Sequence, residues 1–132
     1  MASASGRCLC GAVRYKFDPD AVLWCGYCHC DSCRRACSAP VTAYFGVRRS
    51  AWRWFGQAAA QFQSSAHATR YFCQTCGSQL GFRTDKLPDE FHGFAASLDD
   101  PVDFAPQAHF FHAEALPWLH IDDDLTRHER GG

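Results

Sequence analysis

The chain has 132 residues, a formal net charge of −1 at pH 7 and hydrophobic residues at 47% of its positions. This length suits a single domain, and the near-neutral charge disfavours nucleic-acid binding, for which a basic surface stripe is typical. No run of residues approaches the ~20 apolar positions that span a bilayer, so the sequence predicts no association with a membrane.

The predicted secondary structure consists mainly of short strands. Residues 7–17 alternate apolar and polar positions around a glycine and predict a strand with a bend, while residues 21–27 predict a buried strand. One helical turn is expected over residues 31–36, with Asp31 as its N-cap. Further strands are predicted over residues 41–47, 52–55, 60–63, 69–72, 79–84, 91–98 and 108–112. Because no helical pattern reaches about ten residues, we predict an all-β fold.

The two ends of the chain are predicted to be loose. Residues 1–6 are small and polar, and they lack the charged and apolar parts of a secretory signal, which favours a cytoplasmic location. The aspartates at positions 122–124 predict a solvated turn in a polar C-terminal segment. We therefore expect one domain over residues 6–125, with loose tails at residues 1–5 and 126–132.

Nine cysteines are a high number for this length. A secreted disulfide framework usually has an even number of cysteines at spread-out positions. Here the number is odd, and the cysteines fall mostly in C-x-C and C-x-x-C units. In a reducing compartment such spacings are typical of metal ligands, so the sequence favours bound metal over disulfides.

Two cysteine pairs far apart in the sequence predict one closed metal site. Cys8 and Cys10 would lie on the same face of a strand, because side chains at i and i+2 point the same way. Cys73 and Cys76 form a C-x-x-C turn, and Gly77 after them tolerates the positive φ of a zinc knuckle. Four thiolates make a closed tetrahedral site of the structural kind, which would tie the first strand to the middle of the chain.

A third group of cysteines predicts a different kind of site. Cys28, Cys30 and Cys33 offer three thiolates within six residues. Three protein ligands leave a fourth position open, as in catalytic zinc sites, and a thiol arriving there would lose its proton. Arg34 and Arg35 stand next to this group and could bind a substrate carboxylate through two parallel hydrogen bonds.

Other interpretations of these residues stay open at this point. Cys25 could close the second site as a fourth ligand, which would suit a non-catalytic zinc module that binds a protein partner. Otherwise Cys25 and Cys37 are expected to be small buried apolar residues. Arg34 and Arg35 could be only a solvated pair. His29 would point away from the neighbouring cysteines if it lies on a strand.

Three segments that contain these cysteines resemble the signatures of a known family. They are residues 6–15 (GRCLCGAVRY), 28–35 (CHCDSCRR) and 70–80 (RYFCQTCGSQL), and residues 97–101, 109–111 and 116–118 match the downstream pattern. On these motifs the chain resembles the glutathione-dependent formaldehyde-activating enzyme family, which shares its domain with centromere protein V. The resemblance extends from residue 6 to about residue 125.

The resemblance implies a fold, two metal sites and an activity. The fold would be the β-tent, a set of antiparallel sheets that binds zinc. A catalytic zinc would be held by Cys28, Cys30 and Cys33. A structural zinc would be held by Cys8, Cys10, Cys73 and Cys76. The implied reaction joins the thiol of glutathione to formaldehyde to give S-hydroxymethylglutathione, which would make the chain a carbon–sulfur lyase with a small-molecule thiol as its partner. The sequence leaves open whether the chain forms a homo-oligomer.

Overall fold

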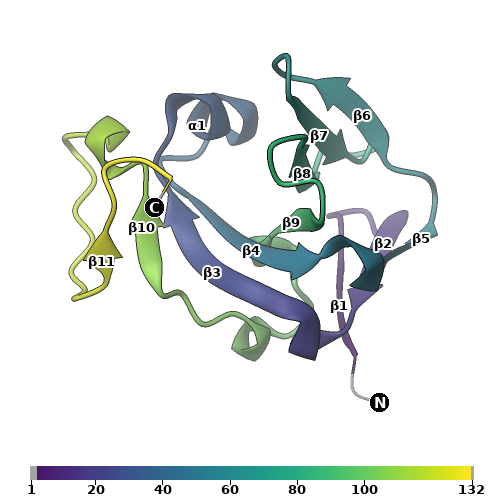
Figure 1. The fold of residues 1–132 in the computed structure, drawn as a ribbon. Coiled ribbons are helices and arrows are strands. Elements are labelled where there is room, and N and C mark those ends of the chain that lie inside the picture. The colour runs from purple at the N-terminus through teal and green to yellow at the C-terminus, as the bar shows by residue number, and fades with distance from the viewer. Residues whose placement is uncertain (1–2, 132) are drawn as a thin grey trace.

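Two β-sheets and one short α-helix make up the chain in a computed structural model that describes residues 3–131 (Figure 1). The smaller sheet has the strand order β1-β2-β5, with the bounds Ala4–Arg7, Val13–Phe17 and Trp52–Gly56. The larger sheet has the order β11-β10-β3-β4-β9-β8-β7-β6. Its strands, taken from β3 to β4 and then from β6 to β11, are Val22–Cys28, Thr42–Arg48, Ala60–Gln63, Ala68–Phe72, Gln79–Thr84, Glu90–Phe94, Ala108–Phe110 and Thr126–Arg127. The all-β prediction is confirmed.

The helices are few and short. The single α-helix among the described residues, α1, spans Asp31–Cys37 between β3 and β4. Its N-cap is Cys30 and not Asp31 as predicted, since the Cys30 sulfur accepts a hydrogen bond from the N–H of Cys33. In the same described part of the chain, five 3-10 turns cover Pro19–Ala21, Arg49–Ala51, Ala95–Ser97, Pro101–Asp103 and His112–Glu114. Across residues 3–131, no helix has the length and apolar character needed to cross a membrane.

Strand pairing is antiparallel in most of the molecule, as expected for a β-tent. The exceptions lie at β10, which runs parallel to both β3 and β11. β10 therefore extends the large sheet beyond β3 and places the C-terminal part of the chain beside the segment that follows Cys28 (Figure 1).

Several predicted boundaries are corrected. Residues 7–17 form the end of β1, a turn and β2, and not one bent strand. The strand predicted over residues 91–98 ends at Phe94 and continues as a 3-10 turn, and the strand predicted over residues 108–112 ends at Phe110. In both cases the apolar run continues past the last residue that has a strand partner, so periodicity alone gives no stop signal.

Both predicted tails contain paired backbone. Ala4 and Ser5 pair with β2, and β11 pairs with β10, so the expectation of loose ends at residues 1–5 and 126–132 is wrong for these positions. Asp123, predicted to lie in a solvated turn, accepts hydrogen bonds from His109 and from the backbone N–H of Leu125. Residues 1, 2 and 132 lie outside the described residues.

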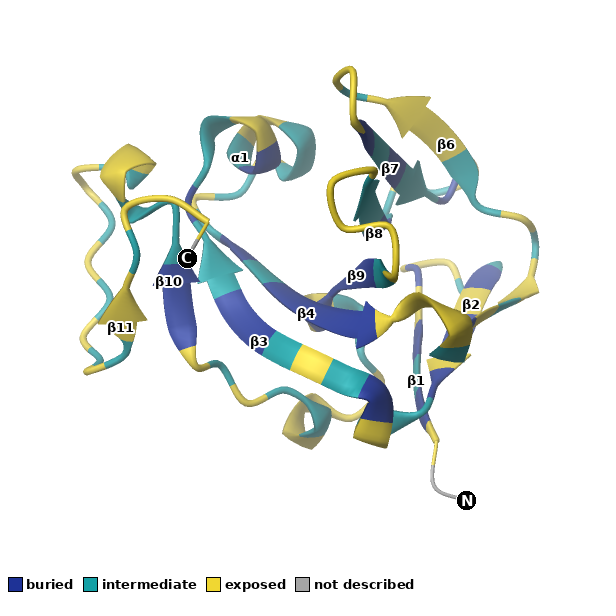
Figure 2. Ribbon diagram, viewed as in Figure 1, coloured by how far each residue is buried: buried dark blue, intermediate teal, exposed yellow. Residues whose placement is uncertain are grey.

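Side chains from both sheets contribute to the core. β2 alternates buried and exposed positions along its length, which is the period-2 pattern of a half-buried strand. The rings of Tyr15 and Trp52 stack with centroids 4.2 Å apart, and Phe91 from the large sheet lies 4.3 Å from Trp52. Cys8 and Cys73 belong to the same buried cluster. Figure 2 shows burial concentrated along the central strands, β4 among them, while β6 is largely exposed.

Candidate metal centres

The first cysteine cluster joins two turns from distant parts of the chain. The Sγ atoms of Cys8, Cys10, Cys73 and Cys76 lie within 4.8 Å of one another. The sulfurs of Cys8 and Cys10 are 3.6 Å apart, and those of Cys10 and Cys73 are 3.8 Å apart. Sulfurs bound to one tetrahedral zinc at about 2.3 Å would be about 3.8 Å apart, whereas a disulfide needs about 2.05 Å. The separations therefore fit one metal ion that is bound by all four sulfurs.

Both turns of the first cluster depend on a glycine. The Gly11 N–H donates to the Cys8 carbonyl at 3.1 Å, and the Gly77 N–H donates to the Cys73 carbonyl at 2.7 Å. Each glycine has a φ of +81°, a conformation that side chains with a Cβ rarely adopt. The predicted role of Gly77 is confirmed. The predicted strand geometry at Cys8 and Cys10 is wrong, because their sulfurs converge through a turn.

Hydrogen-bond donors surround the sulfurs of the first cluster. The Val13 N–H donates to the Cys8 sulfur at 3.3 Å, and the Cys76 N–H donates to the Cys73 sulfur at 3.5 Å. The Ser78 hydroxyl lies 3.2 Å from the Cys76 sulfur and accepts the Leu9 N–H at 2.9 Å, which joins the two turns. Hydrogen bonds from Ser78 and from backbone N–H groups lower the pKa of Cys76 to about 5. Such donors favour thiolates, the form that binds metal.

The second cysteine cluster forms where β3 runs into α1. Cys28 ends β3, Cys30 caps the helix, and Cys33 lies in its first turn. Their three sulfurs lie within 4.8 Å of one another, with Cys28 and Cys33 3.7 Å apart. This separation again suits a shared tetrahedral metal ion. The start of a short helix brings the three predicted ligands together, and one of them, Cys30, is also the N-cap residue of that helix.

The sulfurs of the second cluster differ in how readily they lose a proton. Hydrogen bonds from Cys28 and Cys30 lower the pKa of Cys33 to about 2, and the Tyr44 hydroxyl and the Arg70 guanidinium act in the same direction. The hydrogen bonds of Cys28 with Cys30 and Cys33 raise the pKa of the Cys28 thiol. The Cys33 sulfur therefore lies beside two groups that favour its thiolate form, the Tyr44 hydroxyl and the buried Arg70 guanidinium.

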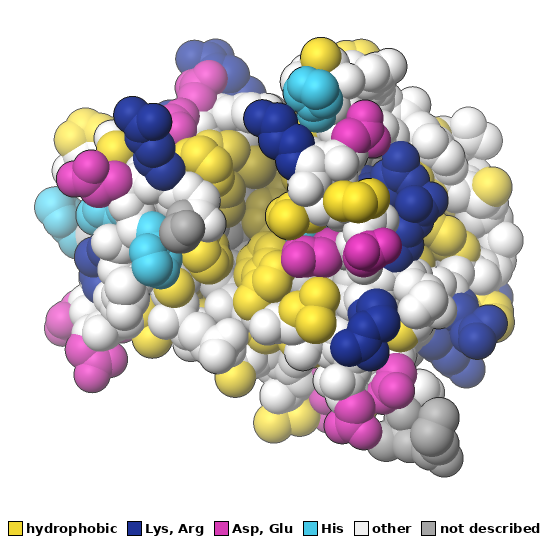
Figure 3. Space-filling model, in the orientation of Figure 1, with side chains coloured by type: hydrophobic (Ala, Val, Ile, Leu, Met, Phe, Trp, Pro, Cys, Tyr) yellow, Lys and Arg dark blue, Asp and Glu magenta, His cyan; other side chains and the backbone are white. Residues whose placement is uncertain are grey.

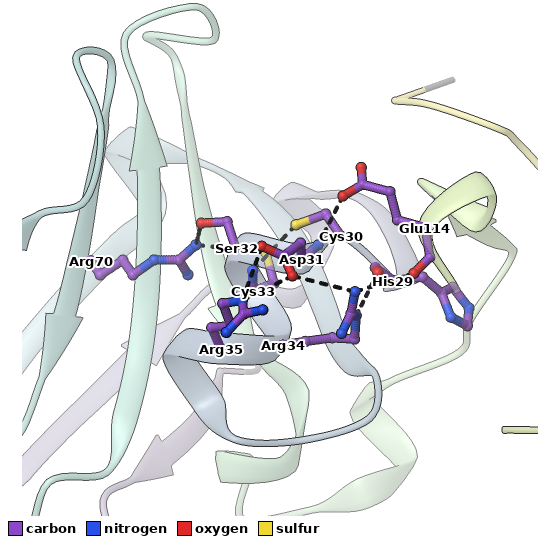
Figure 4. A network of polar contacts seen from close by, with 9 residues as sticks. All are labelled: His29, Cys30, Asp31, Ser32, Cys33, Arg34, Arg35, Arg70 and Glu114. Atoms are coloured by element: carbon purple, nitrogen blue, oxygen red, sulfur yellow. Dashed lines mark hydrogen bonds and ion pairs between the residues drawn. The ribbon is translucent and has the colours of Figure 1, made fainter. Parts of the chain in front are cut away.

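Arg70 and Tyr44 belong to this site, although no sequence pattern predicted a role for either. Arg70 lies on β7, is only 4% exposed, and donates from Nη2 to the Ser32 hydroxyl at 2.8 Å and to the Cys33 sulfur at 3.8 Å (Figure 4). Tyr44 lies within 3.5 Å of both Arg70 and the Cys33 sulfur. Arg70 stands three residues before Cys73, so β7 supplies a charge to the second cluster and leads directly into a ligand of the first. Its place in the RYFCQTCG motif, three residues before Cys73, was the one feature of the sequence that could have indicated a role for Arg70.

Arg34 and Arg35 lie on α1 beside the second cluster. Arg34 donates to the backbone carbonyls of His29 and Glu114, at 3.1 and 3.3 Å, and Arg35 pairs with Asp31 at 2.9 Å (Figure 4). Together with Trp118, both arginines line a separate surface depression and not the cavity at the cysteines. Substrate binding by Arg34 and Arg35 stays a prediction.

A cavity of about 790 Å³ opens onto the second cluster, and all three of its cysteines line the wall. Its other walls come from β3, β4, β7, β8, β9 and β10, from α1, from the loops between β6 and β7 and between β8 and β9, and from Phe111 and Gly131. In Figure 3 hydrophobic side chains gather in a hollow between α1 and the strands β6 to β8. In the first cluster Cys8 and Cys73 are at most 1% exposed, whereas Cys10 is exposed and Cys76 is half-buried.

All nine cysteines lie within residues 3–131, and all are free thiols. Cys25 is buried in the main core, and burial raises the pKa of its thiol. Cys37 is half-buried one helical turn after Cys33, and burial raises its pKa to about 11. Neither belongs to the three-sulfur group, so the interpretation in which Cys25 closes the second site has no geometric support in the described chain.

His29 points away from the second cluster into a buried polar chain. Its Nε2 lies 2.8 Å from Nδ1 of His109, whose Nε2 lies 2.8 Å from a carboxylate oxygen of Asp123. His29 and His109 are at most 2% exposed. The chain of contacts fixes the loop between Cys28 and Cys30 against β10 and the C-terminal segment.

A family model described as the glutathione-dependent formaldehyde-activating enzyme matches residues 3–114. The chain belongs to this family. An uncharacterised lyase from the yeast Schizosaccharomyces pombe is 34% identical over 83 residues, which cover 62% of this chain and 58% of the yeast protein. A crystal structure of a Rhodobacter sphaeroides protein, a structural genomics target, is similar with a TM-score of 0.62 and 27% identity, over 75% of this chain and 93% of that one.

Proposed function

We propose that this member of the family is a zinc-dependent carbon–sulfur lyase that forms or cleaves the adduct of a thiol and an aldehyde. Family membership and the name of the yeast relative support a lyase. The single observation that carries the proposal is the contrast in ligand number: three convergent sulfurs face a cavity, while the other four-sulfur set is closed.

The proposed metal at both clusters is zinc, because thiolate sets at tetrahedral separations suit this ion. The first cluster would be structural, since its four sulfurs leave no position for a substrate. At the second cluster, bound zinc would supply a Lewis acid with one position free for a thiolate. Cys28, Cys30 and Cys33 would hold it there, and Arg70 and Tyr44 would fix the Cys33 sulfur.

The proposed reaction is balanced without any further reactant. In the direction of synthesis the thiol sulfur forms a bond to the aldehyde carbon, and the carbonyl π electrons move to oxygen. That oxygen takes up a proton in place of the one lost from the thiol, and cleavage is the reverse. The walls of the cavity would exclude water and hold the two reactants together, which raises their effective concentration.

The family description supports glutathione and formaldehyde as the first pair to test. Under this proposal Arg34 and Arg35 would bind a glutathione carboxylate in the separate surface depression that they line on α1. The replacement Arg35→Ala should then raise KM for glutathione and leave kcat unchanged, because the contact would be present in both the ground state and the transition state.

The deciding experiment measures adduct formation from glutathione and formaldehyde by zinc-loaded protein, with the spontaneous rate subtracted. We expect acceleration that is lost in Cys28→Ser and kept in the matched control Cys37→Ser. X-ray absorption should show three sulfurs on the second zinc, with a fourth appearing when thiol is added. Four sulfurs on every zinc before any thiol is added, together with no acceleration across several thiols and aldehydes, would favour a non-catalytic module.

A further inference from the structure

The cavity at the second cluster is walled mainly by aromatic and apolar side chains. Its volume of about 790 Å³ is within the range of small-molecule sites, which is about 300–1,000 Å³. The aromatic members of the wall come from four different strands and the residue after β10; they are Trp24, Tyr44, Phe82, Phe110 and Phe111. Leu87, Ala68 and two glycines extend this apolar surface.

The positive charges in the wall are poorly placed for a substrate carboxylate. The Arg70 guanidinium is bound by Ser32 and the Cys33 sulfur, and it stacks over the Phe82 ring at 5.1 Å. Its charge offsets the negative charge of the cysteine cluster. Lys86 is exposed on the loop between β8 and β9, where an ion pair with a substrate would contribute little in water.

The negative charge in the wall is also engaged. Glu90 is the one acidic residue among the described residues that line the cavity. Its Oε1 accepts hydrogen bonds from Trp24 at 3.0 Å and from His92 at 2.9 Å. Both partners are themselves part of the wall, so this carboxylate holds the aromatic lining in place.

Hydroxyls of Ser64, Ser65 and Thr84 also line the wall, but these features leave the charged groups of a zwitterionic tripeptide without a free buried partner of opposite charge. Glutathione carries two carboxylates, one ammonium and two amides, and each would lose water on entering an apolar cavity. Burying a polar or charged group without a partner is unfavourable, and buried charges in proteins are normally paired. A wall of aromatic rings instead favours a flat apolar group, since such rings prefer to pack against one another.

We propose that the thiol partner of this protein has an uncharged apolar body of about the size of a phenyl ring, which packs against Trp24, Phe82 and Phe110 while its sulfur lies at Cys28, Cys30 and Cys33. This inference rests on the proposed function for the reaction and concerns only which thiol enters. The aldehyde in the balanced reaction above is unchanged.

Binding of three thiols to the zinc-loaded protein tests the inference. Benzyl mercaptan carries the apolar ring, glutathione carries the charged peptide, and 2-mercaptoethanol has a small body and serves as the control. By isothermal titration calorimetry we expect benzyl mercaptan to bind at least about tenfold more tightly than either of the others, since buried aromatic contacts of about 1.4 kcal/mol correspond to that factor. Its binding should show a negative heat-capacity change, which marks burial of apolar surface.

A pair of variants locates the contact. Phe110→Ala should weaken benzyl mercaptan about tenfold and leave 2-mercaptoethanol unchanged, because it removes only the wall and not the sulfur site. Phe62→Ala is the matched control, since Phe62 is 62% exposed on β6 and is not part of the cavity wall. If Phe110→Ala does not fold, Phe110→Leu takes its place. Leucine preserves more of the packing, so this variant should lose less affinity for benzyl mercaptan than an alanine variant would.

The possible outcomes separate this inference from the proposed lyase activity. Tighter binding of glutathione than of benzyl mercaptan overturns the inference, and turnover of glutathione would still support the lyase. Tight, Phe110-dependent binding of benzyl mercaptan supports the inference even if its adduct with formaldehyde forms no faster than without protein. Failure of all three thiols to bind overturns it.

Discussion

The two cysteine clusters use the same side chain for sites that differ in enclosure. The first draws its four sulfurs from two glycine turns about sixty residues apart in sequence; Cys8 and Cys73 lie against the core, and Cys10 is exposed. The second takes three sulfurs from one local segment and faces a cavity. The difference teaches that ligand number and access to a cavity, more than the presence or the burial of cysteine, distinguish a site suited to holding the fold together from one that can accept a substrate.

The largest expected effect is loss of a ligand from the first cluster. Cys73→Ser should unfold the chain, because structural zinc contributes about 10–16 kcal/mol of apparent folding free energy and whole domains have only about 5–15 kcal/mol of stability. Far-UV circular dichroism and zinc content per chain measure this. A folded Cys73→Ser variant that still binds two zinc ions would show that the closed site is not structural.

The corresponding change at the second cluster should leave the fold intact. Cys28→Ser is expected to bind one zinc ion in place of two, to melt as a folded protein, and to lose thiol-dependent turnover. The reason is that Cys28 lies at the end of β3 and at the cavity, outside the main core. Equal melting behaviour of Cys28→Ser and Cys73→Ser would remove the distinction between the two clusters.

A smaller effect should follow from replacing the guanidinium beside Cys33 with a different cation. Arg70→Lys removes the planar guanidinium that contacts both Ser32 and the Cys33 sulfur, and lysine cannot reproduce that geometry. We expect zinc affinity at the second cluster to fall about 10–100-fold, the range found when a residue that orients metal ligands is lost. Competition with a chelator measures the affinity. Arg83→Lys, at an arginine of β8 that pairs with Asp85 and is not part of the cavity wall, should leave it unchanged.

The smallest effect is expected at Cys25. Cys25→Ala should reduce the free energy of unfolding by about 1 kcal/mol, because it removes one small buried group from the core. Both zinc ions should remain, since the Cys25 sulfur belongs to neither cluster. Loss of one zinc ion in this variant would instead support the interpretation in which Cys25 is the fourth ligand of the second cluster.

Local spacing was sufficient to predict most strands and the convergence of the sulfurs in the second cluster. Cys28, Cys30 and Cys33 converge within one segment, and the glycine after Cys76 forms the turn that its position predicts. Period-2 alternation likewise predicted β2 without knowledge of its neighbours. These features depend on contacts between residues that are close in sequence or on a pattern within one strand.

Features set by distant partners could not be predicted in the same way. Arg70 reaches Cys33 only because β7, β8, β9 and β4 lie side by side in the large sheet. The two residues of β11 form a strand because β10 is there to pair with them, and Asp123 is held by His109 from the same strand. The aromatic cavity wall is assembled from several strands, and no short segment contains its pattern.

The placement of Arg70 and Cys73 on one continuous stretch has a consequence for how the protein matures. An ion bound at the first cluster would hold Cys73 just after the end of β7, the strand from which Arg70 extends toward Cys33. The two centres should therefore fill in sequence during assembly, with the enclosed one first and the open one second. Stepwise addition of zinc to the refolding apoprotein would then yield a singly loaded, folded species before the doubly loaded protein.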